Sequence, residues 1–87
     1  MKYRTVPGII LTSVCDNYYL VSQKNTVVIN ETAAFYWKQI EKGADEKELP
    51  DLAMRYYEID DSEELYKDIE KMLNSFLEMQ MIKRLDE

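Results

Sequence analysis

The first third of the chain alternates short apolar runs with polar turn residues. Three runs rich in β-branched and aromatic residues lie at 9–15, 18–22 and 26–29, a composition typical of strands. Asp16 and Asn17 separate the first two runs, and such side chains favour turns because they bond to the turn's own backbone. The pattern predicts three strands joined by short turns, which is an antiparallel meander.

From residue 30 onward, apolar positions recur every three or four residues, the period of an amphipathic helix. The first such stretch predicts a helix over residues 31–42, with Asn30 as its N-terminal cap and Gly43 just after its end. The second stretch predicts a short helix over residues 49–57. Its start is set by Pro50, because proline costs little only in the first turn of a helix.

Capping residues are also expected for the second and third helices. Asp45 precedes the second helix and can cap it. Asp60 and Glu63 have the spacing of a capping box, in which each side chain accepts a hydrogen bond from the other residue's backbone amide. The third helix is expected to run from there to about residue 79. Residues 81–85 then form a short tail that can pack as a strand.

The order of elements is therefore β-β-β-α-α-α. A chain of 87 residues accommodates one small domain, so residues 1–87 are expected to form a single domain. Residues 1–8, ending in the turn pair Pro7 and Gly8, are expected to be a flexible N-terminal arm. A three-stranded antiparallel sheet followed by three helices predicts an α+β fold of the winged-helix type.

The composition argues against most kinds of catalytic chemistry. The chain has no histidine and one cysteine, which excludes imidazole catalysis, histidine or thiolate metal sites and an intramolecular disulfide. With no nucleophile–base pair and no glycine-rich phosphate loop, we expect no enzyme activity, no metal and no cofactor. Cys15 is interpreted as a small buried apolar residue, with a reactive thiol as the alternative. The acidic residues 60–64 are interpreted as a helix start rather than a metal loop.

The net charge of −6 bears on location and partners. Residues 43–87 carry −8 and residues 1–42 carry +2, so the acidity lies in the second half. Because phosphate contacts need a basic surface, no nucleic-acid partner is expected, and a winged-helix DNA-binding regulator is the less favoured alternative. No apolar run is long enough for a membrane span or a signal peptide. We therefore expect a cytoplasmic protein without a membrane partner.

The third strand, residues 26–29, lacks the features that usually protect a sheet edge. It contains no charged residue and no proline, and natural edge strands are commonly blunted by such residues. Either the chain's own tail covers this edge, or the edge is kept for a partner that adds as a further strand. The sequence leaves both possibilities open. An open edge also permits two copies of the chain to pair as a homodimer.

Three segments match an ordered set of family motifs. Residues 28–37 resemble hhLNxTAxxIW, residues 48–60 resemble EIxxxLxxxYxVD, and residues 68–82 resemble DVxxFLxxLxxxGLI. This set resembles the PqqD-like family, comprising the pyrroloquinoline quinone biosynthesis chaperone D and its relatives. These are stand-alone recognition elements for the precursors of ribosomally made, modified peptides (RiPPs). The chain departs from the motifs at Ile29, Lys42, Pro50 and Gln80.

The resemblance implies a winged-helix-like peptide chaperone without catalytic residues or a cofactor. In such proteins the leader of a precursor peptide binds as an added antiparallel strand and is presented to a modifying enzyme of natural product biosynthesis. That enzyme is a radical S-adenosylmethionine (SAM) maturase or, in lasso peptide pathways, a leader protease. Carried over by position, the leader would pair with Thr26, Val27, Val28 and Ile29. It would also contact one flank of the third helix, at Tyr66, Glu70, Leu73, Asn74 and Leu77.

Two of these positions and the nature of the leader have further interpretations. Leu73 and Leu77 are explained equally well as core residues. The three methionines Met72, Met79 and Met81 could fill the core or line an adaptable groove. The acidic second half of the chain favours a basic or amphipathic leader.

Overall fold

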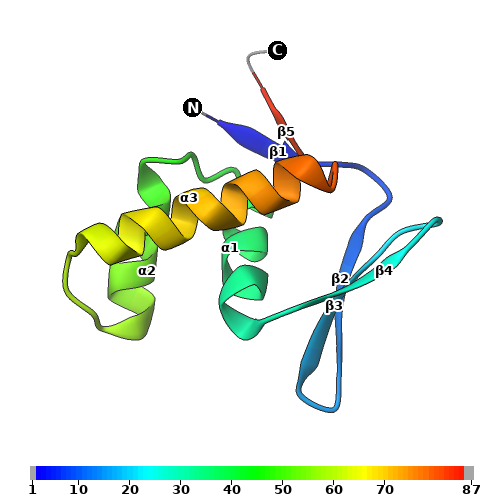
Figure 1. Cartoon of the computed structure of the whole chain (residues 1–87), viewed down its shortest axis with the longest axis horizontal. Helices are drawn as coiled ribbons and strands as arrows, with labels where there is room; N and C mark the ends of the chain where they lie inside the picture. The colour runs from blue at the N-terminus through cyan, green and yellow to red at the C-terminus, as the bar shows by residue number, and fades with distance from the viewer. Residues whose placement is uncertain (1, 86–87) are drawn as a thin grey trace.

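The computed structural model describes residues 2–85 of the chain. Its strands and helices form two small sheets around three helices (Figure 1). In chain order the elements are β1 (Tyr3–Thr5), β2 (Ile10–Val14), β3 (Asn17–Val21), β4 (Thr26–Ile29), α1 (Glu31–Glu41), α2 (Glu48–Tyr57), α3 (Glu63–Glu78) and β5 (Ile82–Arg84).

The predicted antiparallel meander is confirmed, with β3 between β2 and β4. Leu20 at the centre pairs with Leu11 on one side and Val27 on the other. The turn between β2 and β3 lies one residue earlier than predicted. Cys15 and Asp16 form it with φ values of 50° and 68°, the positive pair that a two-residue type I′ hairpin requires. The expectation of a buried Cys15 is therefore wrong: the turn exposes this side chain.

The first two helices begin much as predicted. The Asn30 side chain accepts a hydrogen bond of 2.7 Å from the amide of Ala33 and so caps α1. A capping box precedes α2, where Asp45 Oδ1 accepts from the Glu48 amide at 2.9 Å and Glu48 Oε1 accepts from the Asp45 amide at 3.2 Å. Pro50 is the third residue of α2, within the first turn, where its missing amide costs little.

The predicted capping box at the start of α3 is wrong. The cap is Ser62, whose hydroxyl accepts a hydrogen bond from the Leu65 amide at 3.2 Å. Asp60 lies two residues before this cap, and Glu63 is the first helical residue. Asp and Ser have similar preferences for the N-cap position, so this preference alone does not distinguish Asp60 from Ser62. With Ser62 as the cap, both Leu65 and Ile69 are buried.

The N-terminal segment is not the free arm expected for residues 1–8. Tyr3–Thr5 forms β1 and pairs with the predicted tail strand, β5, in a two-stranded antiparallel ribbon. The ribbon stands at the top of Figure 1, on the far side of α3 from the hairpin tip. Tyr3 is only 5% exposed and joins the hydrophobic core, so burial of this side chain ties the segment to the domain.

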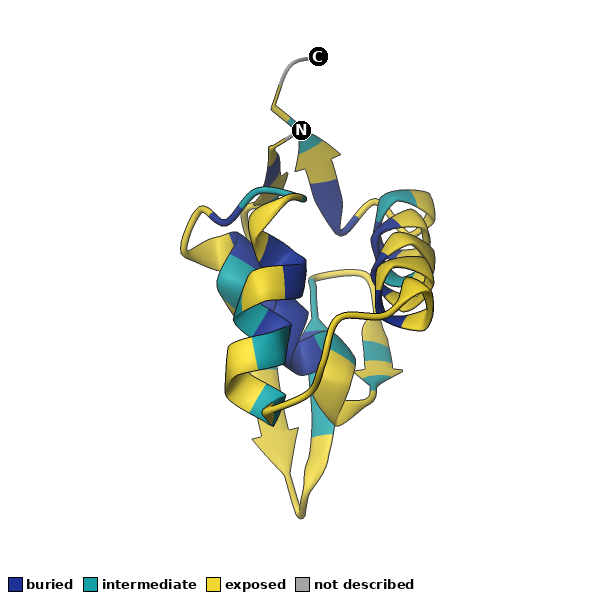
Figure 2. Ribbon diagram, turned by 90° about the vertical axis from the view of Figure 1, so that its left-hand side faces the viewer, coloured by how far each residue is buried: buried dark blue, intermediate teal, exposed yellow. Residues whose placement is uncertain are grey.

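The core lies between the helices and one face of the β2–β3–β4 sheet. Figure 2 shows the buried residues on the sides of the helices that face one another. Trp37 of α1 is fully buried and meets Phe76 of α3 edge to face, with ring centroids 5.6 Å apart. The prediction of Trp37 as a core anchor is confirmed. None of the helices among residues 2–85 is long and apolar enough to cross a membrane.

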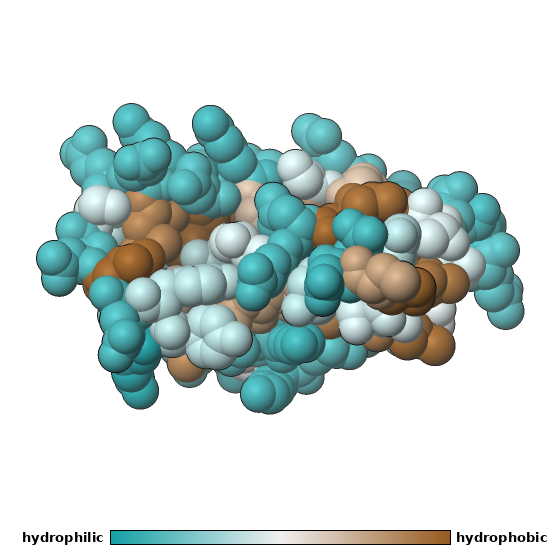
Figure 3. All heavy atoms as spheres, turned by 90° about the horizontal axis from the view of Figure 1, so that it is seen from below, coloured by the Kyte–Doolittle hydropathy of each residue, from teal (hydrophilic) through white to brown (hydrophobic). Residues whose placement is uncertain are grey.

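The outer face of the β2–β3–β4 sheet keeps apolar residues in contact with solvent. Ile10, Val14 and Val28 are all more than half exposed. Hydrophobic patches appear toward both ends of Figure 3, and those at the right lie on the side where this sheet stands in Figure 1. The sheet therefore has apolar side chains on both faces, so its free edge adjoins apolar surface on either side.

Candidate functional site

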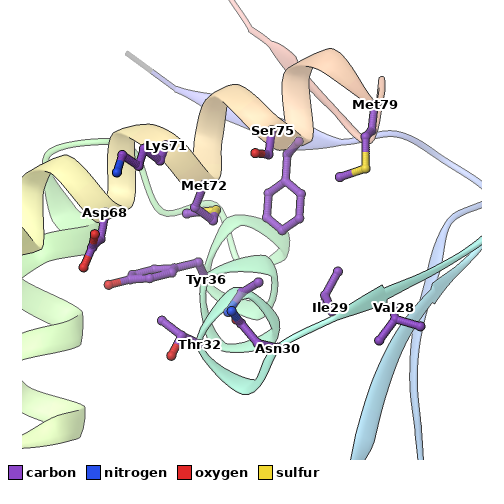
Figure 4. Close-up of a pocket in the computed structure, with 12 residues that line it drawn as sticks. Val28, Ile29, Asn30, Thr32, Tyr36, Asp68, Lys71, Met72, Ser75 and Met79 are labelled. Carbon is purple, nitrogen blue, oxygen red and sulfur yellow. The ribbon is translucent and has the colours of Figure 1, made fainter.

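β4 is an open edge of the three-stranded sheet. Within the described part of the chain it pairs only with β3, and the tail strand β5 pairs with β1 in a separate sheet. Of the two possibilities left by the sequence, coverage by the chain's own tail is therefore not what the structure shows. The edge formed by Thr26–Ile29 faces the space beside α3 (Figure 4).

The hydrogen-bonding pattern between β3 and β4 identifies which backbone groups of β4 point toward the open edge. The Ser22 amide donates a hydrogen bond of 2.8 Å to the Asn25 carbonyl, which makes this a hydrogen-bonded pair. Such pairs alternate along an antiparallel ladder, so Val27 bonds to its partner Leu20 in β3. The N–H and C=O groups of Thr26 and Val28 then point away from β3. These groups are available to an added strand.

A hollow of about 500 Å³ lies between β4 and α3, beside the first turns of α1. We call it the β4–α3 groove. Met79 of α3 faces Ile29 and Val28 of β4 across it (Figure 4), and Phe76 of α3 also lines it. The lining residues are Val28, Ile29, Asn30, Thr32, Ala33, Tyr36, Asp68, Lys71, Met72, Ser75, Phe76 and Met79. The groove is thus an apolar channel with polar side chains along its helical rim.

One end of the β4–α3 groove is polar. Burial, with further contributions from Tyr57 and Asp68, raises the pKa of Tyr36 to about 12. Its phenol therefore stays protonated at neutral pH and can donate a hydrogen bond. Figure 4 shows the hydroxyl end of Tyr36 on the same side of the groove as Asp68. No group of three or more metal-ligating side chains occurs among residues 2–85.

The structure brings together only some of the residues predicted for this site. Val28 and Ile29 line the groove, and Thr26 and Val27 belong to the same edge strand. On α3 none of the five predicted residues lines it. Leu73 is 1% exposed and belongs to the core, and Leu77 packs against the core. The other three are exposed and lie off the groove: Tyr66, Glu70 and Asn74.

The helix flank that faces β4 is the opposite one. It carries six lining residues: Asp68, Lys71, Met72, Ser75, Phe76 and Met79. Both flanks border the same buried stripe, and the apolar period locates the stripe without indicating which side the sheet will occupy. A usable signal was the pair Met72 and Met79, seven residues apart, because this spacing places two adaptable side chains on one side of a helix.

The architecture is an α+β, winged-helix-like fold with a three-stranded antiparallel sheet followed by three helices, as predicted. Over residues 18–82 the sequence matches the family of Coenzyme PQQ synthesis protein D (PqqD). This match spans most of the chain, and the protein belongs to that family. The resemblance inferred from the three motifs is confirmed.

A solved structure shares this fold. It is TbiB1 in complex with the TbiA(beta) leader peptide, with a TM-score of 0.77. The alignment covers 92% of this chain and 94% of that chain, at 15% sequence identity. A similarity at this level of identity establishes the fold alone. No curated protein sequence matches the chain.

Proposed function

We propose that this protein binds the leader of a ribosomally synthesised precursor peptide as a strand added to β4, and presents that peptide to a modifying enzyme. The observation that carries the proposal is the open, uncharged edge of β4 beside an apolar groove. Two findings support it. The chain belongs to the PqqD family, and the similar fold of TbiB1 was solved with a leader peptide bound.

The outward N–H and C=O groups of Thr26 and Val28 provide the main-chain bonds of such a complex. Successive side chains of an added strand point to opposite faces, so every second leader residue would face α3 and enter the β4–α3 groove. There it would meet Met72, Phe76 and Met79. Main-chain bonds give affinity in this mode of binding, and pockets for alternate side chains give selectivity.

We assign the peptide contacts to both walls of the groove. On the sheet they are the four residues predicted from the sequence, Thr26 to Ile29. On α3 they are Lys71, Met72, Ser75 and Met79, in place of the flank predicted from the sequence. Methionine side chains adapt to differently shaped partners, so the groove suits large apolar leader residues without demanding one particular side chain.

The role in maturation is that of a carrier without catalytic activity, acting in the cytoplasm. A leader held at one end raises the effective concentration of the attached core peptide at an enzyme that the carrier also contacts. The enzyme partners proposed for this role are a radical SAM maturase or a leader protease. The carrier needs no chemistry of its own, because the bond changes take place on the enzyme.

The test is a titration with synthetic leader peptides of the short precursors found among the neighbouring genes. Amide resonances of the isotope-labelled protein are followed as leader is added. We expect saturable shifts along residues 26–29 and along the groove side of α3, residues 68–79. Saturable binding that leaves the amides of β4 unchanged would contradict strand addition. No saturable shift anywhere would contradict leader binding itself.

A further inference from the structure

The groove occupies one flank of α3, and the other flank borders a second hollow. This hollow, of about 740 Å³, lies where the end of α3 meets the β1–β5 ribbon. Seven residues line it: Arg4, Val6, Leu77, Gln80, Ile82, Lys83 and Arg84. We call it the ribbon hollow. It shares no lining residue with the β4–α3 groove, so the two can be occupied at the same time.

The ribbon hollow is basic on a protein that is acidic overall. Three of its lining residues are basic and none is acidic, whereas the chain carries a net charge of −6. Arg4 pairs directly with Lys83 across the ribbon, and directly opposed residues of antiparallel strands project to the same face. Both side chains are exposed. Their positive charges are thereby held side by side, and both residues line the hollow.

Neither strand of the ribbon contains an acidic residue. Glu78 is exposed on α3 but does not line the hollow, and Asp45 forms a backbone bridge with Lys2. In sequence the ribbon is followed by Asp86 and Glu87, which lie outside the described residues. Within residues 2–6 and 79–85, all of the charged residues are basic.

The hollow also has apolar walls. Of the residues that line it, Val6 and Leu77 are half-buried and Ile82 is buried. Positive charges beside apolar residues suit a peptide segment that combines carboxylates with an apolar side chain. Nucleic acid fits poorly, because nucleic-acid binding draws on many phosphate contacts and the chain surrounding this small basic site is acidic.

We propose that the ribbon hollow docks an acidic segment of a partner protein, with at least one apolar side chain of that segment entering between Val6 and Leu77. This site is additional to the leader groove and does not depend on leader binding. A carrier that holds a peptide for an enzyme needs two surfaces that can be engaged together. The two flanks of α3 provide such a pair.

The test uses a short synthetic peptide in which glutamates flank a single leucine, and a matched peptide with glutamine in place of glutamate. Binding is followed through the amide resonances of residues 2–6 and 77–85. We expect saturable shifts there for the glutamate peptide, and affinity lower by about tenfold for the glutamine peptide. Equal affinities would overturn the proposal, as would tighter binding of a short DNA duplex at the same salt concentration.

Two double variants distinguish an effect of the ribbon hollow on peptide binding from an effect of the protein's net charge. Arg4→Glu with Lys83→Glu should weaken binding of the glutamate peptide by about tenfold. Lys24→Glu with Lys47→Glu makes the same change of charge at exposed positions outside every hollow described, and should weaken binding by less than about threefold. If both double variants lose the same affinity for the glutamate peptide, net charge alone explains the binding and the proposal is overturned.

A further double variant in the ribbon hollow and a single variant in the leader groove serve as controls. Opposed glutamates repel one another across a ribbon, so the double variant Arg4→Glu with Lys83→Glu could unfold. The uncharged double variant Arg4→Gln with Lys83→Gln avoids this repulsion. It should weaken binding of the glutamate peptide by about threefold. Val28→Pro alters only the leader groove and should bind the glutamate peptide as the unaltered protein does. Loss of binding in Val28→Pro would show that the peptide occupies β4 and would overturn this site, whereas a failed leader titration would leave it standing.

Discussion

Replacing Val28 with proline tests strand addition by removing a backbone N–H to which an added strand would bond. The Val28 amide faces the open edge rather than β3, as the hydrogen-bonded Ser22–Asn25 pair requires. Proline has no N–H, and edge strands tolerate it at positions whose amide faces outward. The variant should therefore remove a leader contact while leaving the bonds between β3 and β4 in place.

The expected loss can be worked from the strand itself. β4 has four residues, of which two, Thr26 and Val28, direct their amides outward. Losing one of these two donors removes a hydrogen bond with a net value of about 1 kcal/mol, and the proline ring displaces the approaching strand from a neighbouring bond of similar value. Together these give about 2 kcal/mol, or roughly a thirtyfold increase in the leader's Kd.

Two matched variants accompany this measurement. Val28→Ala keeps the amide and shortens a side chain that is 67% exposed, so the leader's Kd should rise by less than about threefold. Val27→Pro removes an amide that bonds to Leu20 in β3, and should instead lower the free energy of unfolding by about 2 kcal/mol. Calorimetric titration gives Kd. Urea unfolding, followed by the emission of the buried Trp37, gives stability.

Two outcomes would contradict this account of β4. If Val28→Pro stays folded and binds leader with an unchanged Kd, the main-chain edge of β4 is not where the leader binds. If Val28→Pro and Val27→Pro lose the same amount of stability, the assignment of inward and outward amides along β4 is wrong.

Three further predictions concern single side chains. Asn30→Ala removes the cap of α1 and should lower the free energy of unfolding by about 1 kcal/mol, and an unchanged urea midpoint would contradict this. The unfolded form of Tyr36 ionises near pH 10 and the folded form near 12, so stability should fall across that window, by at most about 1.4 kcal/mol per pH unit. Tyr36→Phe should reduce this slope, and parallel pH curves for the two proteins would count against it. Met79→Glu should weaken leader binding by about tenfold, whereas Asn74→Glu on the other flank of α3 should change it by less than about twofold. The reverse order would restore the flank predicted from the sequence.

The parts of the fold that depend on nearby residues could be predicted from the sequence. The meander follows from alternating runs and turns, and α1 follows from its period and the cap at Asn30. The errors in these local predictions are shifts of one or two residues, because neighbouring residues can serve equally well as a helix cap or a turn. Ser62 caps α3 instead of Asp60, and the turn after β2 begins at Cys15 instead of Asp16, one residue earlier.

The parts that depend on distant residues could not be predicted. β1 becomes a strand only because β5 lies beside it, and neither three-residue segment carries a pattern long enough to predict the other. The same limit applies to the candidate site. The edge strand β4 was identified from its missing charges, but the side of α3 that faces it depends on how the helix crosses α1. Met72 and Met79 therefore line the groove, and Asn74 does not.

The β1–β5 ribbon also sets an order of events during synthesis. Tyr3 pairs with Arg84 at the other end of the chain, whereas the strands of the meander meet within residues 10–29. Every residue that lines the β4–α3 groove precedes residue 80. A growing chain on the ribosome can therefore contain all of the groove while β1 still has no partner strand. The ribbon closes after the other elements, because β5 follows every other strand and helix of the described residues in sequence.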